Sequence, residues 1–178
     1  MARTGRSSGA WKERCNMNIE LRERTESHVR IYFEKVQDEE IKEMLPQTAQ
    51  SAEQAVAEFR KTLLPGAASF GRTIYADGKY VGDIWCYCID LIDTPNAMLS
   101  YCVVEKELWG KGIATEALGQ FVAEIVPKFG LKTLGAFAYC ENKASLRVLE
   151  KNGFASVETF TEDGVASAYY ERDTEERK

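Results

Sequence analysis

The sequence lacks a long apolar run, an excess of positive charge and all but one histidine. No apolar stretch approaches the roughly 20 residues that a membrane-spanning helix needs, so we expect no membrane span. The 23 lysines and arginines are outnumbered by 28 aspartates and glutamates, and the resulting net charge of −5 argues against a nucleic-acid-binding face. The single histidine, His28, is predicted to be a surface residue in the first turn of an early helix rather than a catalytic group.

The five cysteines are not arranged as metal ligands. Cys86 and Cys88 share one face of a predicted strand, but no C-x-x-C pair and no paired histidines accompany them, so we expect no zinc site. A cysteine nucleophile needs a base partner, and none is indicated. An odd number of cysteines, mostly in predicted strands, is typical of reduced thiols, and we therefore expect a cytoplasmic protein.

What remains is the composition of one globular domain with a sizeable core. Residues 1–16 are basic and contain glycine and serine, but no apolar segment of a signal peptide follows them. We predict a disordered extension there, with Met17 as an alternative start of the natural chain. The domain is then expected to span residues 17–173, followed by a charged tail over residues 174–178.

The apolar periodicity predicts a mixed α/β fold in a single domain. Seven strands are predicted over residues 19–22, 70–76, 80–89, 98–104, 134–139, 154–160 and 165–170. Four or five helices are predicted between them, over residues 25–36, 37–45, 51–64, 113–126 and 142–153. Thr48 or Ser51 is expected to cap the third helix, Asp77-Gly78 to form a tight hairpin turn, and Pro127 to end or kink the long helix.

A buried strand, a glycine loop and a helix follow one another at the centre of the chain. Gly110 and Gly112 lack Cβ atoms, which lets main-chain N–H groups close on a bulky phosphate, and Lys111 adds a positive charge. The first turn of the helix has N–H groups without an internal partner, which favours an anion. The loop matches neither a P-loop nor the three-glycine dinucleotide fingerprint. A tight turn with close strand–helix packing is the alternative interpretation.

Two motifs together resemble a known family. The first is WGKGIATEA, starting at Trp109, and the second is NKASLRVLEKNGF, starting at Asn142. In this order they resemble the signatures of the GNAT superfamily of N-acetyltransferases, in its Rim-type branch of ribosomal-protein N-terminal acetyltransferases. The resemblance covers roughly residues 19–172. It implies an acyl-CoA N-acyltransferase fold, whose fourth and fifth strands splay apart to admit the acetyl-pantetheine arm while the acceptor enters from the opposite side.

The resemblance also implies roles for residues of both motifs. Acetyl-CoA, the acetyl donor, would be held by the loop residues Trp109, Gly110, Lys111, Gly112, Ile113, Ala114 and Thr115, and by main-chain groups of Cys102, Val103 and Val104. Asn142 would contact the pantetheine arm, with helix capping as the alternative reading. Ser145, one turn later on the same helix face, is a candidate acid near the coenzyme sulfur, and Tyr139 and Cys140 are alternative proton donors.

The general base is where the sequence departs from the pattern of the branch. Many members have a glutamate at the start of the fourth strand, where this chain has Met98. Asp83 and Glu158 lie on predicted strands and are candidates, although each is more simply read as a surface or turn-end carboxylate, and water offers a third route for the proton. Glu107 replaces the glutamine or arginine that often begins the pyrophosphate motif, so its charge must point to solvent if the loop binds phosphate.

The sequence therefore predicts an enzyme that moves an acetyl group from acetyl-CoA to a primary amine, by direct attack in a ternary complex. The amine belongs to a protein N-terminus or to a small molecule, and the aromatic candidates for its pocket are Tyr32, Phe33, Trp85, Tyr87 and Tyr101. A coenzyme A-binding sensor or regulatory module without turnover is the alternative, because the strand-four glutamate is missing. Family members are often dimers, which leaves a homodimer open.

Overall fold

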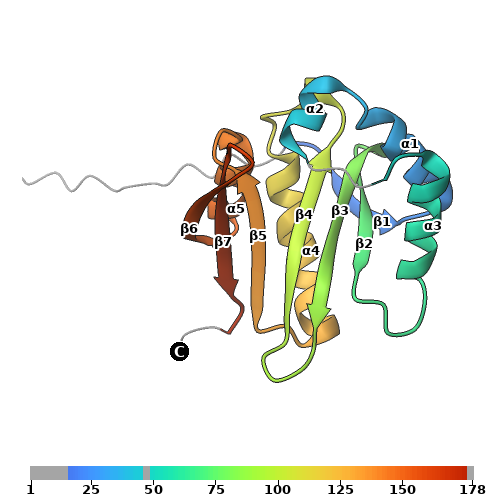
Figure 1. Ribbon diagram of the computed structural model, residues 1–178. Coiled ribbons are helices and arrows are strands. Elements are labelled where there is room, and N and C mark those ends of the chain that lie inside the picture. Colours follow the sequence, from blue (N-terminus) through green and yellow to red (C-terminus); the bar gives the residue numbers. More distant parts are fainter. Residues whose placement is uncertain (1–15, 46–48, 176–178) are drawn as a thin grey trace, which may run out of the picture.

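The computed structural model describes residues 16–45 and 49–175 of the chain (Figure 1). The predicted N-terminal extension, apart from its last residue, lies outside these ranges, as do Thr48 and residues 176–178 of the predicted tail. Within them, the elements follow the predicted order of strand, helices, three strands, helix, strand, helix and two strands.

Seven strands in the described ranges form one mixed sheet. They are β1 (Ile19–Glu23), β2 (Phe70–Ala76), β3 (Lys79–Asp90), β4 (Asn96–Val103), β5 (Thr133–Tyr139), β6 (Ala155–Glu162) and β7 (Val165–Asp173). Their order across the sheet is β1-β2-β3-β4-β5-β7-β6, and each neighbouring pair is antiparallel except β4 and β5, which are parallel. The predicted mixed sheet of about seven strands is confirmed.

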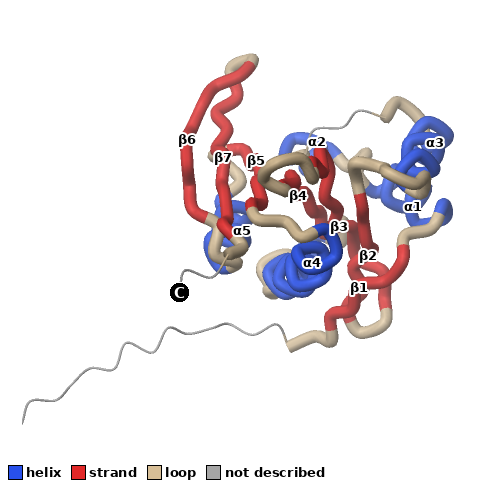
Figure 2. Tube along the Cα trace, turned by 90° about the horizontal axis from the view of Figure 1, so that it is seen from below, coloured by secondary structure: helices blue, strands red, loops and turns tan. Residues whose placement is uncertain are grey.

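Helices cover both faces of this sheet. In the described part of the chain they are α1 (Glu26–Lys35), α2 (Glu39–Met44), α3 (Ala52–Thr62), α4 (Ile113–Phe129) and α5 (Lys143–Lys151), with a short 3₁₀ helix η1 (Lys106–Leu108). Figure 2 shows α4 and α5 on one face and α1, α2 and α3 on the other. The sheet is therefore the middle of three layers.

The main core lies between α4 and the sheet. Ala117, Leu118 and Phe121, at helical spacing on one side of α4, are fully buried and pack in one cluster with Ile84 of β3 and Leu99 of β4. On the opposite face, one smaller cluster joins α1 to α3, and another joins α1 and α2 to the end of β4. Strand β4, which leads into the first motif, is thus packed on both faces.

Strands β4 and β5 pair over only part of their length. Their parallel register starts with Asn96 and Thr133 and ends with Leu99 and Ala136. Beyond this point β4 continues to Val103 and β5 to its own end, but the two strands no longer pair. The predicted splay of the fourth and fifth strands is therefore present, and it leaves main-chain polar groups facing a gap.

Local signals placed most of the element boundaries correctly. Ser51 caps α3 by accepting a hydrogen bond from Gln54 N at 3.1 Å. Asp77 and Gly78 both have positive φ, 48° and 77°, as a tight hairpin turn of the primed type requires.

The long helix α4 does not end at Pro127, which corrects one of the two outcomes expected there. The helix continues to Phe129 and closes at Gly130, which has a φ of 63° and donates its N–H to Val126 O. Proline in the last turn removes a single N–H donor, and the residues after it still find helical carbonyl acceptors. The left-handed glycine, rather than the proline, ends the helix.

Candidate active site

The loop before α4 places two glycines in the left-handed region. Gly110 has a φ of 74°, and Gly112, the N-cap of α4, has a φ of 80°. A side chain with a Cβ is strained in this conformation. The helix starts with a hydrogen bond from Glu116 N to Gly112 O at 3.1 Å, so the N–H groups of residues 113–115 have no partner within the helix. These donors lie at the positive end of the helix dipole, a site suited to phosphate.

The charges beside the loop suit an anion. Lys111, between the two glycines, is exposed and free to reach a phosphate. Glu107 lies in η1 and is also exposed, so its charge is screened by solvent. The substitution of glutamate for glutamine or arginine at this position is therefore compatible with an anion at the loop.

Trp109 links the loop to the end of β4. Its indole Nε1 donates a hydrogen bond to Val103 O at 2.7 Å, while 41% of the residue stays exposed. The carbonyl of Val103 thus points away from β3, toward the side on which β4 faces the gap. The indole is therefore hydrogen-bonded to a main-chain carbonyl that the family resemblance assigns to binding of acetyl-CoA.

The main-chain groups of β4 alternate between its two neighbours. Val104 N donates to Val81 O at 2.8 Å, so this N–H points to β3, and the close approach of Cys102 O to Gly82 places that carbonyl on the same side. Alternation then directs the N–H and C=O of Tyr101 and Val103 toward the gap. Of the three residues expected to hold pantetheine, Val103 therefore faces the gap with its main chain, whereas Cys102 and the N–H of Val104 serve the sheet.

A cavity of about 430 Å³ runs through the sheet where β4 and β5 diverge. Side chains that face α4 and α5 line one part of it, namely Leu99, Tyr101, Ala136, Ala138, Asn142, Ser145 and Leu149. Side chains of the opposite sheet face line the other part, namely Trp85, Tyr87, Ser100, Phe137, Tyr139 and Ser167, together with Met44 and Leu45. The gap therefore connects the two faces of the sheet.

On the α5 side of the cavity, a hydroxyl pair joins Tyr101 to Ser145. The two oxygens are 2.9 Å apart, and Tyr101 Oη is also 3.0 Å from the main-chain O of Ser145. Either hydroxyl can be the donor of this pair, and when Tyr101 donates to Ser145 Oγ, the hydroxyl hydrogen of Ser145 is free for another acceptor. Burial raises the pKa of Tyr101, so its hydroxyl is protonated at neutral pH.

Asn142 and Tyr139 border the same cavity in different ways. Asn142 is the N-cap of α5, and its side-chain oxygen accepts a hydrogen bond from Ser145 N at 3.0 Å. This capping bond leaves the amide NH₂ available as a donor. Tyr139, at the end of β5, lies on the opposite sheet face from Ser145. The two predicted proton donors are thus brought to one cavity but on its two sides.

Asp83 is buried, and the expectation of a surface or turn-end carboxylate is wrong for this residue. Its side chain is 1% exposed and forms an ion pair with Arg24 at 2.7 Å, while Tyr80 Oη donates to Oδ1 at 3.0 Å. Burial raises the pKa of Asp83 to about 6, although Arg24 and the Tyr80 hydrogen bond act in the opposite direction. Strand alternation from Trp85 would have placed Asp83 on an inner face, but its partner Arg24, just after β1, carried no signal in the sequence.

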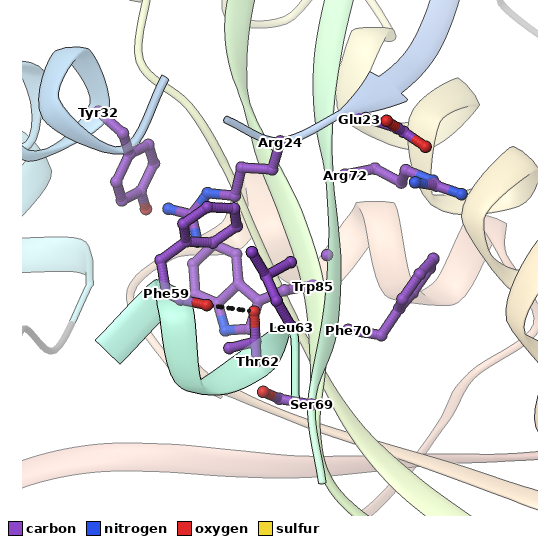
Figure 3. A pocket seen from close by; sticks show the side chains of 11 residues that line it. Glu23, Arg24, Tyr32, Phe59, Thr62, Leu63, Ser69, Phe70, Arg72 and Trp85 are labelled. Carbon is purple, nitrogen blue, oxygen red and sulfur yellow. Dashed lines mark hydrogen bonds between the residues drawn. The ribbon is translucent and has the colours of Figure 1, made fainter. Parts of the chain in front are cut away.

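Arg24 also borders a second cavity, of about 350 Å³, at the edge of the sheet (Figure 3). Its guanidinium carbon lies 5.6 Å from the ring centre of Tyr32 and 5.7 Å from that of Phe59. Trp85 lines this cavity as well as the one between β4 and β5. Neither the glycine loop nor α5 contributes to the second cavity, and Trp85 is the one described residue that lines both cavities.

The remaining candidates lie apart from the β4–β5 cavity. Glu158 is exposed on the edge strand β6, as expected. His28 is half-buried and belongs to the start of α1, where Nδ1 accepts from Thr25 N at 3.2 Å and Nε2 lies 2.8 Å from Tyr75 Oη. Burial lowers the pKa of this histidine. Phe33 lines neither cavity, and Tyr32 lines the second one.

The described residues show neither a metal site nor a membrane-spanning helix. They contain no cluster of histidine, cysteine, aspartate and glutamate side chains that could hold a metal ion. No helix among them is both long and apolar enough to cross a membrane. Cys86 is buried and Cys88 exposed, and all four described cysteines are free thiols.

Comparison with known proteins identifies relatives of this architecture. The family profile described as an acetyltransferase (GNAT) domain matches residues 18–155. A search of curated proteins finds no match. Among solved structures, the ribosomal L7/L12 α-N-protein acetyltransferase RimL in complex with coenzyme A is 21% identical, with a TM-score of 0.74 over 90% of this chain and 96% of its own.

Two further solved structures share the fold. An acetyltransferase from Salmonella typhimurium that modifies the N-terminal serine of the 50S subunit protein L7/L12 is 21% identical, with a TM-score of 0.73 over 88% of this chain and 95% of its own. The aminoglycoside acetyltransferase AAC(6')-Ib in complex with coenzyme A is 16% identical, with a TM-score of 0.73 and the same two coverages. Proteins that act on such different amines thus have similar folds.

Proposed function

The chain belongs to the GNAT acetyltransferase family, and we propose that it transfers the acetyl group of acetyl-CoA to a primary amine by direct attack in a ternary complex. The observation that carries this proposal is the cavity through the β4–β5 gap. Side chains of both sheet faces line it, so a donor from one side and an acceptor from the other would meet there without a covalent enzyme intermediate. The coenzyme complexes of RimL and AAC(6')-Ib support acetyl-CoA as the donor.

The donor would be held by main-chain groups at two places. The N–H groups of residues 113–115 and the side chain of Lys111 would bind the pyrophosphate. The gap-facing groups of Tyr101 and Val103 would extend the sheet by pairing with the amides of pantetheine, as an added strand does. Asn142 would contribute its free amide NH₂ on the α5 side of the arm.

Transfer then requires one bond to form and one to break. The amine nitrogen attacks the thioester carbon, a C–N bond forms, and the C–S bond breaks to release coenzyme A. A main-chain N–H of β4 that faces the gap would polarise the carbonyl oxygen. The thiolate needs a proton, which the Ser145–Tyr101 hydroxyl pair on the α5 side would supply.

The amine loses its proton to water in this proposal. No carboxylate of the described residues lines the cavity, and Asp83 is enclosed by Arg24 and Tyr80. Tyr139, which lines the acceptor side of the cavity, would orient the amine or a bound water through its hydroxyl. Ser145 and Tyr139 therefore have separate roles, one toward the leaving group and one toward the acceptor.

The test is a calorimetric titration with acetyl-CoA of the wild type and of Gly112→Glu. The new side chain puts bulk and negative charge at the anion site, so we expect affinity to fall about 100-fold or more. Gly66→Glu is the matched control, because Gly66 has a similar φ of 76° and no atom within 4 Å of an added Cβ. Both variants carry backbone strain of about 1–2 kcal/mol, and only the first should lose binding.

Wild-type affinity in folded Gly112→Glu would contradict the proposed coenzyme site. Where the wild type binds, release of free thiol with an amine panel decides between the enzyme and a sensor. Binding without any thiol release would favour the sensor.

A further inference from the structure

The acceptor side of the β4–β5 cavity carries no charged side chain among its described lining residues. Six side chains from four strands form this wall: Trp85, Tyr87, Ser100, Phe137, Tyr139 and Ser167. Aromatic rings make up most of it, and the two serines add only hydroxyl groups. Met44 and Leu45, at the end of α2, extend the wall with apolar side chains.

Asp83, the nearest carboxylate along β3, does not belong to this wall. Asp83 lies two positions before Trp85 on the same sheet face, but it is buried and does not line the cavity. Its ion pair with Arg24 and its hydrogen bond from Tyr80 already satisfy its charge. Inside the β4–β5 cavity, a cation bound beside Trp85 would therefore find an aromatic face rather than a counter-ion.

Carboxylates beyond the far side of the wall do not line the cavity either. Glu171 of β7 accepts a hydrogen bond from Tyr169 Oη at 3.0 Å and is exposed to solvent. The start of β4 carries Met98, whose sulfur packs against Gly135 of β5. No negative charge stands at this point of the strand.

We propose that the acceptor is a monoamine whose amino group is attached to an aromatic or apolar body. The inference rests on the proposed function, because it names the substrate class of the same site. An aromatic body gains contact area on Trp85, Tyr87 and Phe137, and a single ammonium gains a favourable approach to the ring faces. Each additional ammonium of a polycation would lose its hydration without meeting a carboxylate.

The lack of a carboxylate among the described lining residues also affects the pKa of the amino group that reacts. An uncharged wall lowers the pKa of a bound ammonium, because desolvation disfavours the charged form. An α-amino group, with an ordinary pKa of about 8, then loses its proton to water more readily than an alkylamine with a pKa of about 10.4. The best acceptor of this class carries its aromatic side chain beside an α-amine.

The experiment compares kcat/KM for four amines by release of free thiol from acetyl-CoA. Phenylalaninamide has the proposed features, glycinamide lacks only the side chain, and spermidine and kanamycin are polycations. We expect phenylalaninamide to exceed glycinamide by about tenfold or more, and to exceed both polycations by a larger factor. Trp85→Ala should reduce the advantage over glycinamide several-fold, mainly through KM.

A carboxylate added to the wall gives a second test, in which the preference should shift toward the polycation. Ser100→Asp places a carboxylate on the wall and should raise kcat/KM for spermidine relative to phenylalaninamide about tenfold or more. Tyr87→Glu tests the same change from β3 if the first variant does not fold. Ser27→Asp, the same substitution at an exposed position of α1, is the matched control and should leave the ranking unchanged.

The outcomes separate this inference from the proposed function. A wild type that prefers spermidine or kanamycin over phenylalaninamide overturns the inference, while the acetyltransferase activity stands. Equal rates with phenylalaninamide and glycinamide, unaffected by Trp85→Ala, also overturn it. A folded chain that binds acetyl-CoA but releases no thiol with any of the four amines overturns the proposed function and this inference together.

Discussion

At the scale of single residues, the proposed chemistry depends on two hydroxyl groups, one on β4 and one on α5. Tyr101 and Ser145 are 2.9 Å apart on the side of the cavity proposed for the coenzyme sulfur. Burial keeps the tyrosine protonated, so the pair has a proton to give to a thiolate. Neither residue carries a charge that would repel the leaving group.

Removal of the Ser145 hydroxyl should slow turnover more than it weakens binding. We expect Ser145→Ala to lower kcat about 10- to 100-fold, because general-acid assistance is lost, while the affinity for acetyl-CoA stays within a few-fold. Tyr101→Phe should have a similar effect on kcat. Steady-state kinetics and calorimetric titration measure the two quantities.

Ser145→Thr is the matched control, since it keeps a hydroxyl at the same place on α5. It should retain most of the activity that Ser145→Ala loses. Full activity in both Ser145→Ala and Tyr101→Phe would remove the pair from the mechanism and leave Tyr139 and Cys140 as the remaining candidates.

The conformations of site residues could be predicted from the sequence where they depend on a few neighbouring residues. Gly112 and Asn142 were found because a left-handed turn and a helix cap are properties of a few neighbouring residues. The pair of Tyr101 with Ser145 was missed, because 44 residues separate the two and only the packing of α5 on the gap brings them together. The ion pair of Asp83 with Arg24 was missed for the same reason, although strand alternation already indicated that Asp83 faces inward.

At the scale of elements, a hydrogen bond connects the glycine loop to the end of β4. Trp109 stands between them, with its indole bonded to Val103 O. The proposed donor pairs with the main chain of Val103 on the same side. Binding of acetyl-CoA and the indole hydrogen bond therefore compete for one carbonyl group.

Titration with acetyl-CoA should accordingly change the tryptophan fluorescence of the protein. The chain has three tryptophans, and we expect Trp109→Phe to remove most of the change while binding persists within about tenfold. Trp85→Phe is the control, because it leaves the Trp109 signal in place. A change that survives in Trp109→Phe and disappears in Trp85→Phe would assign the response to the acceptor side instead.

The order and type of the elements could be predicted because each one carries its own periodicity. Strands β2 and β3 were found from the turn at Asp77 and Gly78, and α4 from its apolar spacing. The end of α4 was less predictable, since Pro127 and Gly130 both signal a stop and only the chain beyond them decides which one acts. The gap between β4 and β5 came from the family resemblance and not from periodicity.

At the scale of the whole molecule, Asp83 couples folding to pH. Folding raises the pKa of this carboxyl to about 6, from about 3.9 in an unfolded chain. Between these values the folded state holds more protons than the unfolded state, so stability decreases as the pH rises from about 4 to about 6. The contribution of Asp83 is greatest below pH 4 and is lost above its folded pKa.

Denaturant unfolding of the wild type and of Asp83→Asn at several pH values tests this coupling. The free energy of unfolding of the wild type, relative to the variant, should fall by roughly 2 kcal/mol between pH 4 and pH 7. The variant cannot titrate at this position, so it corrects for all other groups. Parallel curves for the two proteins, or a wild type that gains relative stability with rising pH, would refute the assigned pKa.

The short ladder between β4 and β5 has a consequence for how the molecule can be divided. Four register pairs connect the two parts of the sheet, and the chain passes from one part to the other once, through α4 and residues 130–132. A backbone cut in this linker would yield one fragment with β1 to β4 and α4, and another with β5 to β7 and α5. Because the proposed donor bridges the line along which these fragments meet, the chain is a natural scaffold for a split-protein reporter of acetyl-CoA.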